Sequence, residues 1–240
     1  LRNEAVKELG RYPRYVRALS ILRKTLDDPN DMLRIIAYES LQKIGRNSAV
    51  MTIPVGDFYL DIVDSKRQDI IYATQSETSR IVLFGSNMEV MRPIYFSALQ
   101  NLLTINASAA DKYITMFRKV GSGSRISPAF KIDPTVKALT RAIGQKAKSG
   151  QGVLMLPDLD SKGKPKRDKD GQIVYKNAGI KGLGLNYGQL VTVLYRLSKQ
   201  GALVSSDTSK PAKFVLQKPL GLQEFLRDAV DSGRPNITGQ

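Results

Sequence analysis

The side chains that carry most protein chemistry are missing from this chain of 240 residues. It contains no cysteine, no histidine and no tryptophan. Thiol nucleophiles, Ser-His triads, Cys/His zinc sites and the imidazole pH switch are therefore excluded. Catalysis would have to use carboxylates, lysines, tyrosines and hydroxyls, and no arrangement of these stands out from background. We expect no enzymatic activity, no metal and no cofactor.

Four carboxylates lie close together in the chain: Asp57, Asp61, Asp64 and Asp69. They do not have the spacing of a metal-binding loop, so a solvated strand edge is the better interpretation. The glycine-rich stretch 179–188 invites comparison with phosphate loops. However, Tyr187 stands where a dinucleotide loop needs glycine, and no Gly-Lys-Ser/Thr follows. We interpret it as an ordinary turn that leads into a helix over 187–200.

The most basic short stretch runs from residue 158 to residue 171. Its Asp-x-Asp start resembles a calcium loop, but lysine occupies two positions that need oxygen ligands. The apolar runs on either side, 152–156 and 172–175, predict a hairpin with this stretch at its tip. Its cations are candidate contacts to a polyanion or a protein partner, with a solvated mobile loop as the alternative: Lys162, Lys164, Lys166, Arg167 and Lys169.

Charge is distributed unevenly along the chain. There are 37 basic and 22 acidic residues, a formal net charge of +15, and residues 111–218 hold 21 of the basic and 7 of the acidic ones. Clustered Lys and Arg attract polyanions and release counterions from phosphates. A polyanion partner and a merely well-solvated basic surface both remain open.

An internal repeat marks the start of the chain. Leu1, Arg2, Ala5 and Leu9 recur 32 residues later as Leu33, Arg34, Ala37 and Leu41. The i, i+4, i+8 spacing puts Leu, Ala and Leu on one helical face in each copy. We therefore expect antiparallel helices over residues 1–45, with Ala5 and Ala37 at their contacts. A further amphipathic helix follows Pro13, and Asp27 to Asp31 breaks the chain before the second copy.

This stretch resembles a HEAT-type helical repeat. The match is carried by Asp28-Pro29-x-x-x-Leu33-Arg34-x-x-Ala37 and covers about 45 residues. The resemblance implies a scaffold for protein partners, because such repeats serve many assemblies. It specifies the fold more than the function.

The period changes to two after residue 57. Candidate strands lie at 58–63, 69–74, 79–84, 93–97, 101–106 and 112–118, separated by turn-forming clusters. We expect a β-rich meander, sandwich or small barrel. Residues 81–84 are apolar on both sides, so this strand should be central. A helix should begin near Asp133-Pro134 and bury Val136, Leu139, Ala142 and Ile143.

The end of the chain resembles a winged-helix domain. The amphipathic helix 187–200 buries Leu190, Val193, Leu194 and Leu197, and an apolar segment, a polar turn and Phe214-Val215-Leu216 follow it. In that family the helix enters the major groove and the wing, here 205–213, contacts phosphates. The resemblance implies four candidate contacts: Arg196, Lys199, Lys210 and Lys213.

A second resemblance involves the same helix. The run Gln189 to Leu203, which closes in Gly-Ala-Leu, is similar to the carboxy-terminal helix of flagellar P-ring proteins. That similarity implies a non-enzymatic assembly component, with a location in the bacterial periplasm or cell envelope. No apolar run approaches the roughly 18 to 20 residues of a membrane span.

The sequence as a whole predicts an α+β protein in three domains. These are a HEAT-like helical repeat (1–50), a β-rich domain (51–120) and a basic, winged-helix-like α+β domain (125–240). The predicted function is a structural or interaction module that binds protein partners through the helical repeat and the basic domain. The alternative is a nucleic-acid-binding protein that uses the winged-helix-like region.

Overall fold

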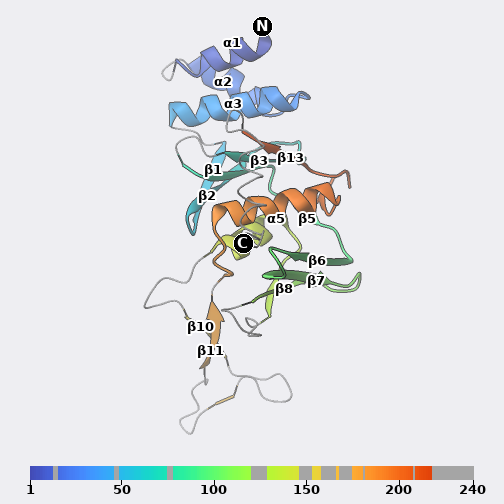
Figure 1. Ribbon diagram of the computed structural model, residues 1–240. Coiled ribbons are helices and arrows are strands. Elements are labelled where there is room, and N and C mark those ends of the chain that lie inside the picture. The colour runs from blue at the N-terminus through green and yellow to red at the C-terminus, as the bar shows by residue number, and fades with distance from the viewer. Residues whose placement is uncertain are drawn as a thin grey trace, which may run out of the picture.

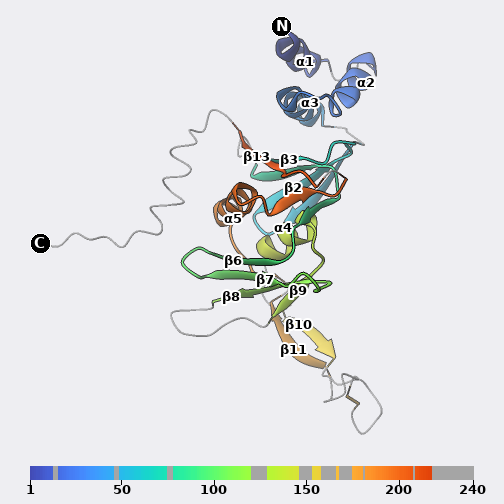
Figure 2. The ribbon, with the colours of Figure 1, turned by 90° about the vertical axis from the view of Figure 1, so that its right-hand side faces the viewer.

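The chain folds into alternating layers of helices and sheets. The structure is a computed structural model that describes residues 1–12, 16–45, 49–74, 78–119, 129–145, 153–157, 166–167, 175–180, 182–207 and 209–217. From the amino-terminal end, three helices lie on a five-stranded sheet, two further helices cover its other face, and a four-stranded sheet follows (Figure 1, Figure 2). The predicted mixed α+β class is confirmed.

Residues 1–45 form what we call the helical unit, made of α1 (Arg2–Leu9), α2 (Val16–Thr25) and α3 (Asp31–Ile44). Asn30 caps α3 by accepting hydrogen bonds from the amides of Met32 and Leu33. Gly45 ends α3 with a φ of 75°, a left-handed conformation that glycine adopts without strain. The break predicted between the two repeat copies is therefore a true helix boundary.

The contact between α1 and α3 differs in detail from the prediction. Ala37 is fully buried as expected, but Ala5 is exposed. Val6 and Gly10 face α3 instead: the Ser40 hydroxyl donates to the carbonyl of Val6 at 3.3 Å, and a Cβ on Gly10 would lie 2.9 Å from that of Ser40. Val6 and Gly10 lie four residues apart and so share one face of the helix. This face is shifted by one residue from the predicted face that contains Ala5, and Ala5 therefore points away from Ala37.

The five-stranded sheet has the order β1-β2-β4-β3-β13. Its strands are β1 (Val50–Val55), β2 (Phe58–Val63), β3 (Ile70–Thr74), β4 (Arg80–Phe84) and β13 (Lys213–Leu216). The strand predicted to be central is β4, at the middle of the sheet. This sheet is not a meander, because β2 pairs in parallel with β4, and β4 in turn pairs antiparallel with β3. A strand that is apolar on both faces takes the most buried place, so β4 separates two strands that are consecutive in the chain.

The four-stranded sheet is an antiparallel meander in the order β6-β7-β8-β9. Its strands are β6 (Ile94–Ala98), β7 (Leu103–Ala107), β8 (Ile114–Arg118) and β9 (Phe130–Ile132). Its first three strands correspond to the candidate strands 93–97, 101–106 and 112–118. The expected set of strands omitted β1, β9 and the short β5 (Met88–Val90). Strand β5 pairs with β12 (Leu203–Ser205).

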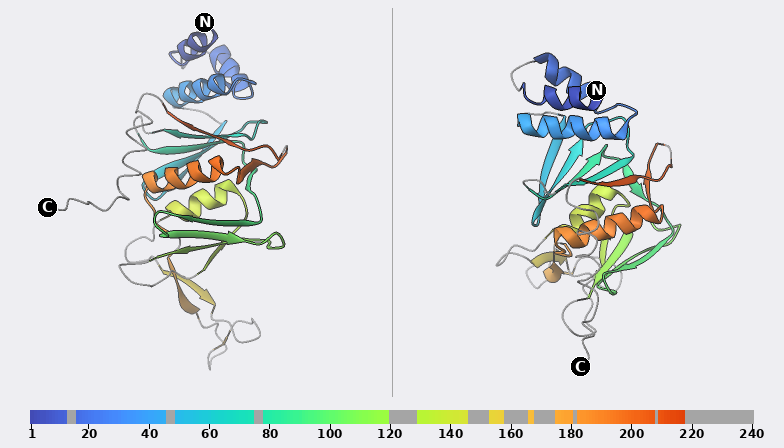
Figure 3. Two further views of the ribbon diagram at one scale, coloured as in Figure 1. Left: turned by 45° about the vertical axis from the view of Figure 1, so that its right-hand side comes forward. Right: turned by 45° about the horizontal axis from the view of Figure 1, so that its top comes forward.

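Helices α4 (Val136–Gly144) and α5 (Tyr187–Lys199) fill the layer between the two sheets (Figure 3). The four α4 residues and the four α5 residues predicted to face the core are all buried. Asn186 and Gln189 form a capping box that starts α5. A hairpin is present at the predicted place, with β10 (Val153–Pro157) paired antiparallel with β11 (Tyr175–Ile180), but β11 begins at the last residue of the predicted second arm, 172–175.

Strands β12 and β13 follow α5, but they join different sheets. They approach each other at a single bridge, Val204 to Pro211, after which β12 runs beside β5 and β13 runs parallel to β3. One hydrophobic cluster extends from Val55 through both sheets and both helices to Ala212. This cluster contains residues from the predicted β-rich domain and from the predicted carboxy-terminal domain.

Candidate functional site

A buried carboxylate lies where the helical unit meets the five-stranded sheet. Asp61 on β2 is fully buried, and its oxygens accept hydrogen bonds from Tyr38 Oη at 2.5 Å and Thr52 Oγ1 at 2.6 Å. Arg80 Nη1 lies 3.0 Å away and forms an ion pair, and Gln42 Nε2 donates at 3.3 Å. Burying a charge is costly unless it is paired and hydrogen-bonded, and Asp61 is both.

The four carboxylates that lie close together in the sequence, Asp57, Asp61, Asp64 and Asp69, therefore do not share one metal site. Interpreting them as a solvated strand edge is wrong for Asp61, because alternation along β2 points this side chain toward α3. Asp69 is engaged as well, accepting from Arg34 Nη1 at 2.8 Å. Among the described residues, no group of three or more acidic, cysteine or histidine side chains could hold a metal ion.

A second charged network ties α3 to the start of β13. Arg34 is fully buried and pairs with Asp31 and Asp69, each at 2.8 Å. Asp31 also accepts from Lys213 Nζ at 2.6 Å. Partial burial would raise the pKa of Asp31, but the hydrogen bonds from Lys213 and Arg34 outweigh burial and hold this pKa below its ordinary value. The network joins residues that lie up to 182 positions apart in the chain.

Beside Asp61 lies a polar pocket of about 500 Å³. The α3 side chains that line it include Glu39, Gln42 and Lys43, and Arg80 and Gln217 line it from the sheet. The Arg80 guanidinium lies over the ring of Tyr59, with its central carbon 4.9 Å from the ring centroid. The pocket is therefore walled by groups from the helical unit, from β4 and from the end of β13.

Two tyrosines at this junction are poorly suited to proton transfer near neutral pH. Burial, together with the neighbouring Asp61 carboxylate, raises the pKa of Tyr38 far above its ordinary value. Burial and the hydrogen bond to Glu39 raise the pKa of Tyr72 in the same way. Both hydroxyls therefore act here as hydrogen-bond donors that hold α3 on the sheet.

The predicted contact cations are dispersed. Lys162, Lys164 and Lys169 lie outside the described residues, whereas Lys166 and Arg167 are described and exposed. Arg196 and Lys199 are exposed on α5, and Lys199 Nζ lies 5.6 Å from the ring centroid of Tyr195. Lys210 is exposed in the turn before β13.

Lys213 has a structural contact, because it pairs with Asp31. The pocket residues Tyr38, Glu39, Arg80 and Gln217 were not singled out from the sequence. The sequence offered one indication that Tyr38 belongs to this site, because Tyr38 directly follows Ala37 of the buried helical face in the repeat. The order of the strands in the sheet is what brings Arg80 and Gln217 close to α3. The sequence pattern does not specify that order.

Comparisons with models of known protein families, with curated proteins and with solved structures find no match to this chain. Within the described residues, no helix is long and apolar enough to cross a membrane.

Proposed function

We propose that this chain is a non-enzymatic interaction module that binds protein partners, with the helical unit as its main contact surface. The resemblance of residues 189–203 to flagellar P-ring proteins suggests an assembly of the bacterial cell envelope as the setting. The charged groups of the candidate site support this proposal. Asp61, Arg34 and Asp69 are all neutralised by partners within the fold, so they serve structure rather than reaction.

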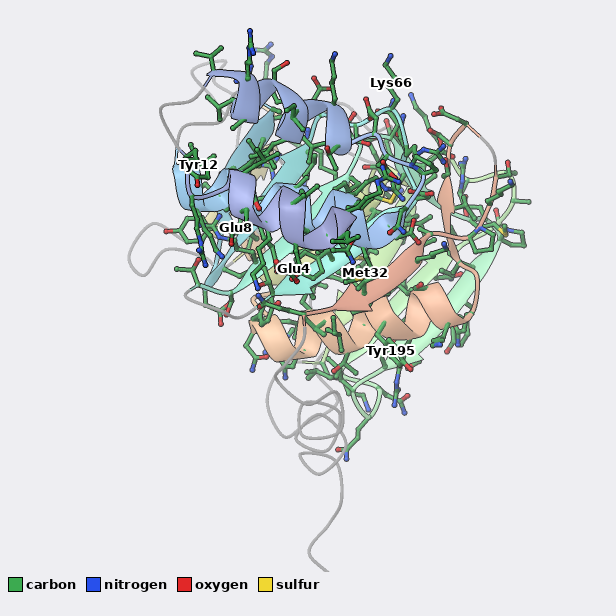
Figure 4. The ribbon with its side chains drawn as sticks, turned by 90° about the horizontal axis from the view of Figure 1, so that it is seen from above. Glu4, Glu8, Tyr12, Met32, Lys66 and Tyr195 are labelled. Carbon is green, nitrogen blue, oxygen red and sulfur yellow. The ribbon has the colours of Figure 1, made fainter. Side chains whose placement is uncertain are left out.

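The observation that carries the proposal is the exposure of apolar side chains on the helical unit. Ten large apolar side chains are exposed in the described part of the chain, and half of them belong to residues 1–45: Leu1, Tyr12, Val16, Ile21 and Met32. Seen from above, Tyr12 and Met32 lie on the outer surface of the helices, and Glu4 and Glu8 follow α1 between them (Figure 4). Exposed apolar groups ringed by charges are typical of protein contact surfaces.

The position of α5 favours this proposal over the nucleic-acid alternative. A helix that enters the major groove must present one whole face to the bases. Six of the thirteen α5 residues are buried between the sheets, and the charged side chains it exposes are Arg196 and Lys199. The proposed contact surface therefore lies on the helical unit, away from α5.

Site-directed photo-cross-linking in the cells that produce the protein tests this proposal. A photoreactive amino acid in place of Ile21 should form one discrete adduct with another protein. The matched control replaces Arg23, which is exposed two residues along α2 and so points to the opposite side of the helix. Equal adduct patterns from both positions, or no adduct from position 21, would contradict the proposal.

A further inference from the structure

The four-stranded sheet has two faces of opposite character. Alternate residues of its strands belong to the hydrophobic cluster that the sheet shares with α4 and α5. Figure 2 shows both helices on the side of this sheet that faces the five-stranded sheet. The other side, which we call the outer face, carries polar and aromatic side chains that are exposed or half-buried: Tyr95, Thr104, Asn106, Thr115, Phe117 and Lys131.

The strand register places one outer-face residue of each strand in a row. Tyr95 of β6 lies opposite Asn106 of β7, and Asn106 lies opposite Thr115 of β8. Thr115 in turn lies opposite Lys131 of β9. Tyr95, at one end of the row, is 77% exposed, and Lys131, at the other end, is exposed as well. The row therefore runs from an open aromatic ring through an amide and a hydroxyl to an ammonium group.

The charge of this sheet is strongly one-sided. Strands β6 to β9 contain no aspartate or glutamate, and residues 92–119 and 129–132 contain five basic residues and one acidic residue. The acidic residue, Asp111, accepts a hydrogen bond from the backbone amide of Ser108 at 2.6 Å, so its carboxylate is engaged within its own turn. Directly before β8, the exposed ring of Tyr113 has Lys112 Nζ 5.4 Å from its centroid. Exposed cations and exposed aromatic rings thus occur together here.

Aromatic rings beside cations are what proteins use to hold single-stranded nucleic acid. Unpaired bases stack on aromatic side chains, Lys and Arg neutralise the phosphates, and amide or hydroxyl groups bond to the base edges. A duplex keeps its bases stacked inside the helix, so it offers these rings little to stack on. An acidic polysaccharide shares the negative charge but has no aromatic ring, so the tyrosines favour nucleic acid over it.

We propose that the outer face binds single-stranded nucleic acid, with bases stacked on Tyr95 and Tyr113 and phosphates at Lys112 and Lys131. The outer face lies on the opposite side of the α4–α5 layer from the helical unit (Figure 2). This site therefore goes beyond the proposed protein contacts of the helical unit, and it can fail without them.

Fluorescence anisotropy of labelled strands, titrated with the whole chain at about 0.15 M salt, tests the site. Oligothymidylate of about twelve nucleotides, a length within the range of small single-strand binding domains, should bind saturably. An abasic strand with the same number of phosphates and a duplex of the same length should each bind at least about tenfold more weakly, because neither offers unpaired bases to the rings. Equal binding of the abasic strand, or no saturable binding of oligothymidylate, would overturn the proposal.

Two variants place the binding on the outer face. Tyr95→Ala removes a largely exposed ring, so it should leave the unfolding midpoint unchanged while weakening oligothymidylate at least about fivefold, as expected for the loss of one stacking contact. Lys131→Gln should lower the slope of log affinity against log salt by about 0.7, the value for one phosphate of a single strand. Tyr12→Ala, at an exposed tyrosine of the helical unit, is the matched control and should bind like the unmodified protein.

Two results with these variants would refute the site. One is oligothymidylate binding that Tyr95→Ala leaves unchanged or that Tyr12→Ala weakens equally. The other is saturable binding of heparin that is lost in Tyr95→Ala while oligothymidylate binding persists, which would assign the outer face to an acidic polysaccharide instead.

Discussion

Asp61 is a carboxylate whose oxygens are occupied by four donors from three different parts of the fold. Tyr38 and Gln42 reach it from α3, Thr52 from β1 and Arg80 from β4. Desolvating a carboxylate costs several kcal/mol, and only a complete set of partners compensates for that cost. At the scale of the residue, the buried Asp61 and its hydrogen bonds therefore hold the junction together with the buried Arg34 and its ion pairs.

Removal of the Asp61 side chain should be among the most damaging single changes. Asp61→Ala leaves Arg80 without its ion-pair partner and the Tyr38 hydroxyl without an acceptor, so we expect a loss of about 3 to 5 kcal/mol in the free energy of unfolding. Urea denaturation measures this loss. Asp64→Ala, at an exposed carboxylate three residues away, is the control and should change stability by less than about 0.5 kcal/mol. Similar values for the two variants would show that Asp61 does not hold the junction.

The Asp31–Lys213 ion pair should make stability depend on acid pH. Because the folded-state pKa of Asp31 lies below the unfolded value of about 3.9, its contribution is complete above that value and is lost as the pH falls through the folded pKa. We expect the unmodified protein to be more stable than Asp31→Asn at pH 7, and the difference to shrink below about pH 4. Denaturation curves collected from pH 2.5 to pH 7 measure it. A difference that grows on acidification would contradict the assignment.

At the scale of the element, α3 is the central helix of its unit. It packs against α1 and α2 and contributes Tyr38 to the hydrophobic cluster beneath, which also contains Phe84 and Tyr72 of the sheet. Tyr38 meets both rings edge-on, with centroids 6.3 Å apart in each case. The guanidinium of Arg34 lies over the Phe84 ring, 5.7 Å from its centroid. Helix α3 thus contacts the helices above it and the sheet below it.

The two alanines of the repeat provide a matched pair of substitutions. Ala37→Phe should overpack the buried contact and cost about 1 to 3 kcal/mol, whereas Ala5→Phe, on an exposed face of α1, should change stability by less than about 0.5 kcal/mol. Thermal unfolding of the two variants compares them directly. An unchanged melting midpoint for Ala37→Phe would argue against the packing of α3 described above.

The local sequence pattern predicted where the helices and strands lie better than it predicted which strands pair with each other. The periods of two and 3.6 located β2, β3, β4 and both core helices, because each depends on residues close in sequence. The pairing of β2 with β4 and of β13 with β3 was not predictable in this way, since long-range packing decides strand order. The same limit applied to the site. Lys213 was singled out as a basic residue of the predicted wing, but its partner Asp31 lies 182 positions earlier in the chain.

At the scale of the whole molecule, the end of the described chain returns to its beginning. Strand β13 completes the five-stranded sheet, and Lys213 reaches α3 above it. Helix α5 packs its apolar face into the layer between the sheets and exposes Arg196 and Lys199 on its other side (Figure 3). The contact surface that we propose for protein partners, the helical unit, lies at the amino-terminal end of the described chain (Figure 1).

Titration of labelled DNA duplexes at two salt concentrations tests the central claim most directly. A duplex reader would bind one sequence preferentially, with affinity falling by a log-log slope of about −0.9 per phosphate contact. Our account predicts weak binding that is indifferent to sequence and abolished near about 0.2 M salt, as expected for a net charge of +15 without a groove-reading helix. Tight, sequence-selective binding at physiological salt that is lost in an Arg196→Ala/Lys199→Ala double variant would contradict the account and support the winged-helix alternative.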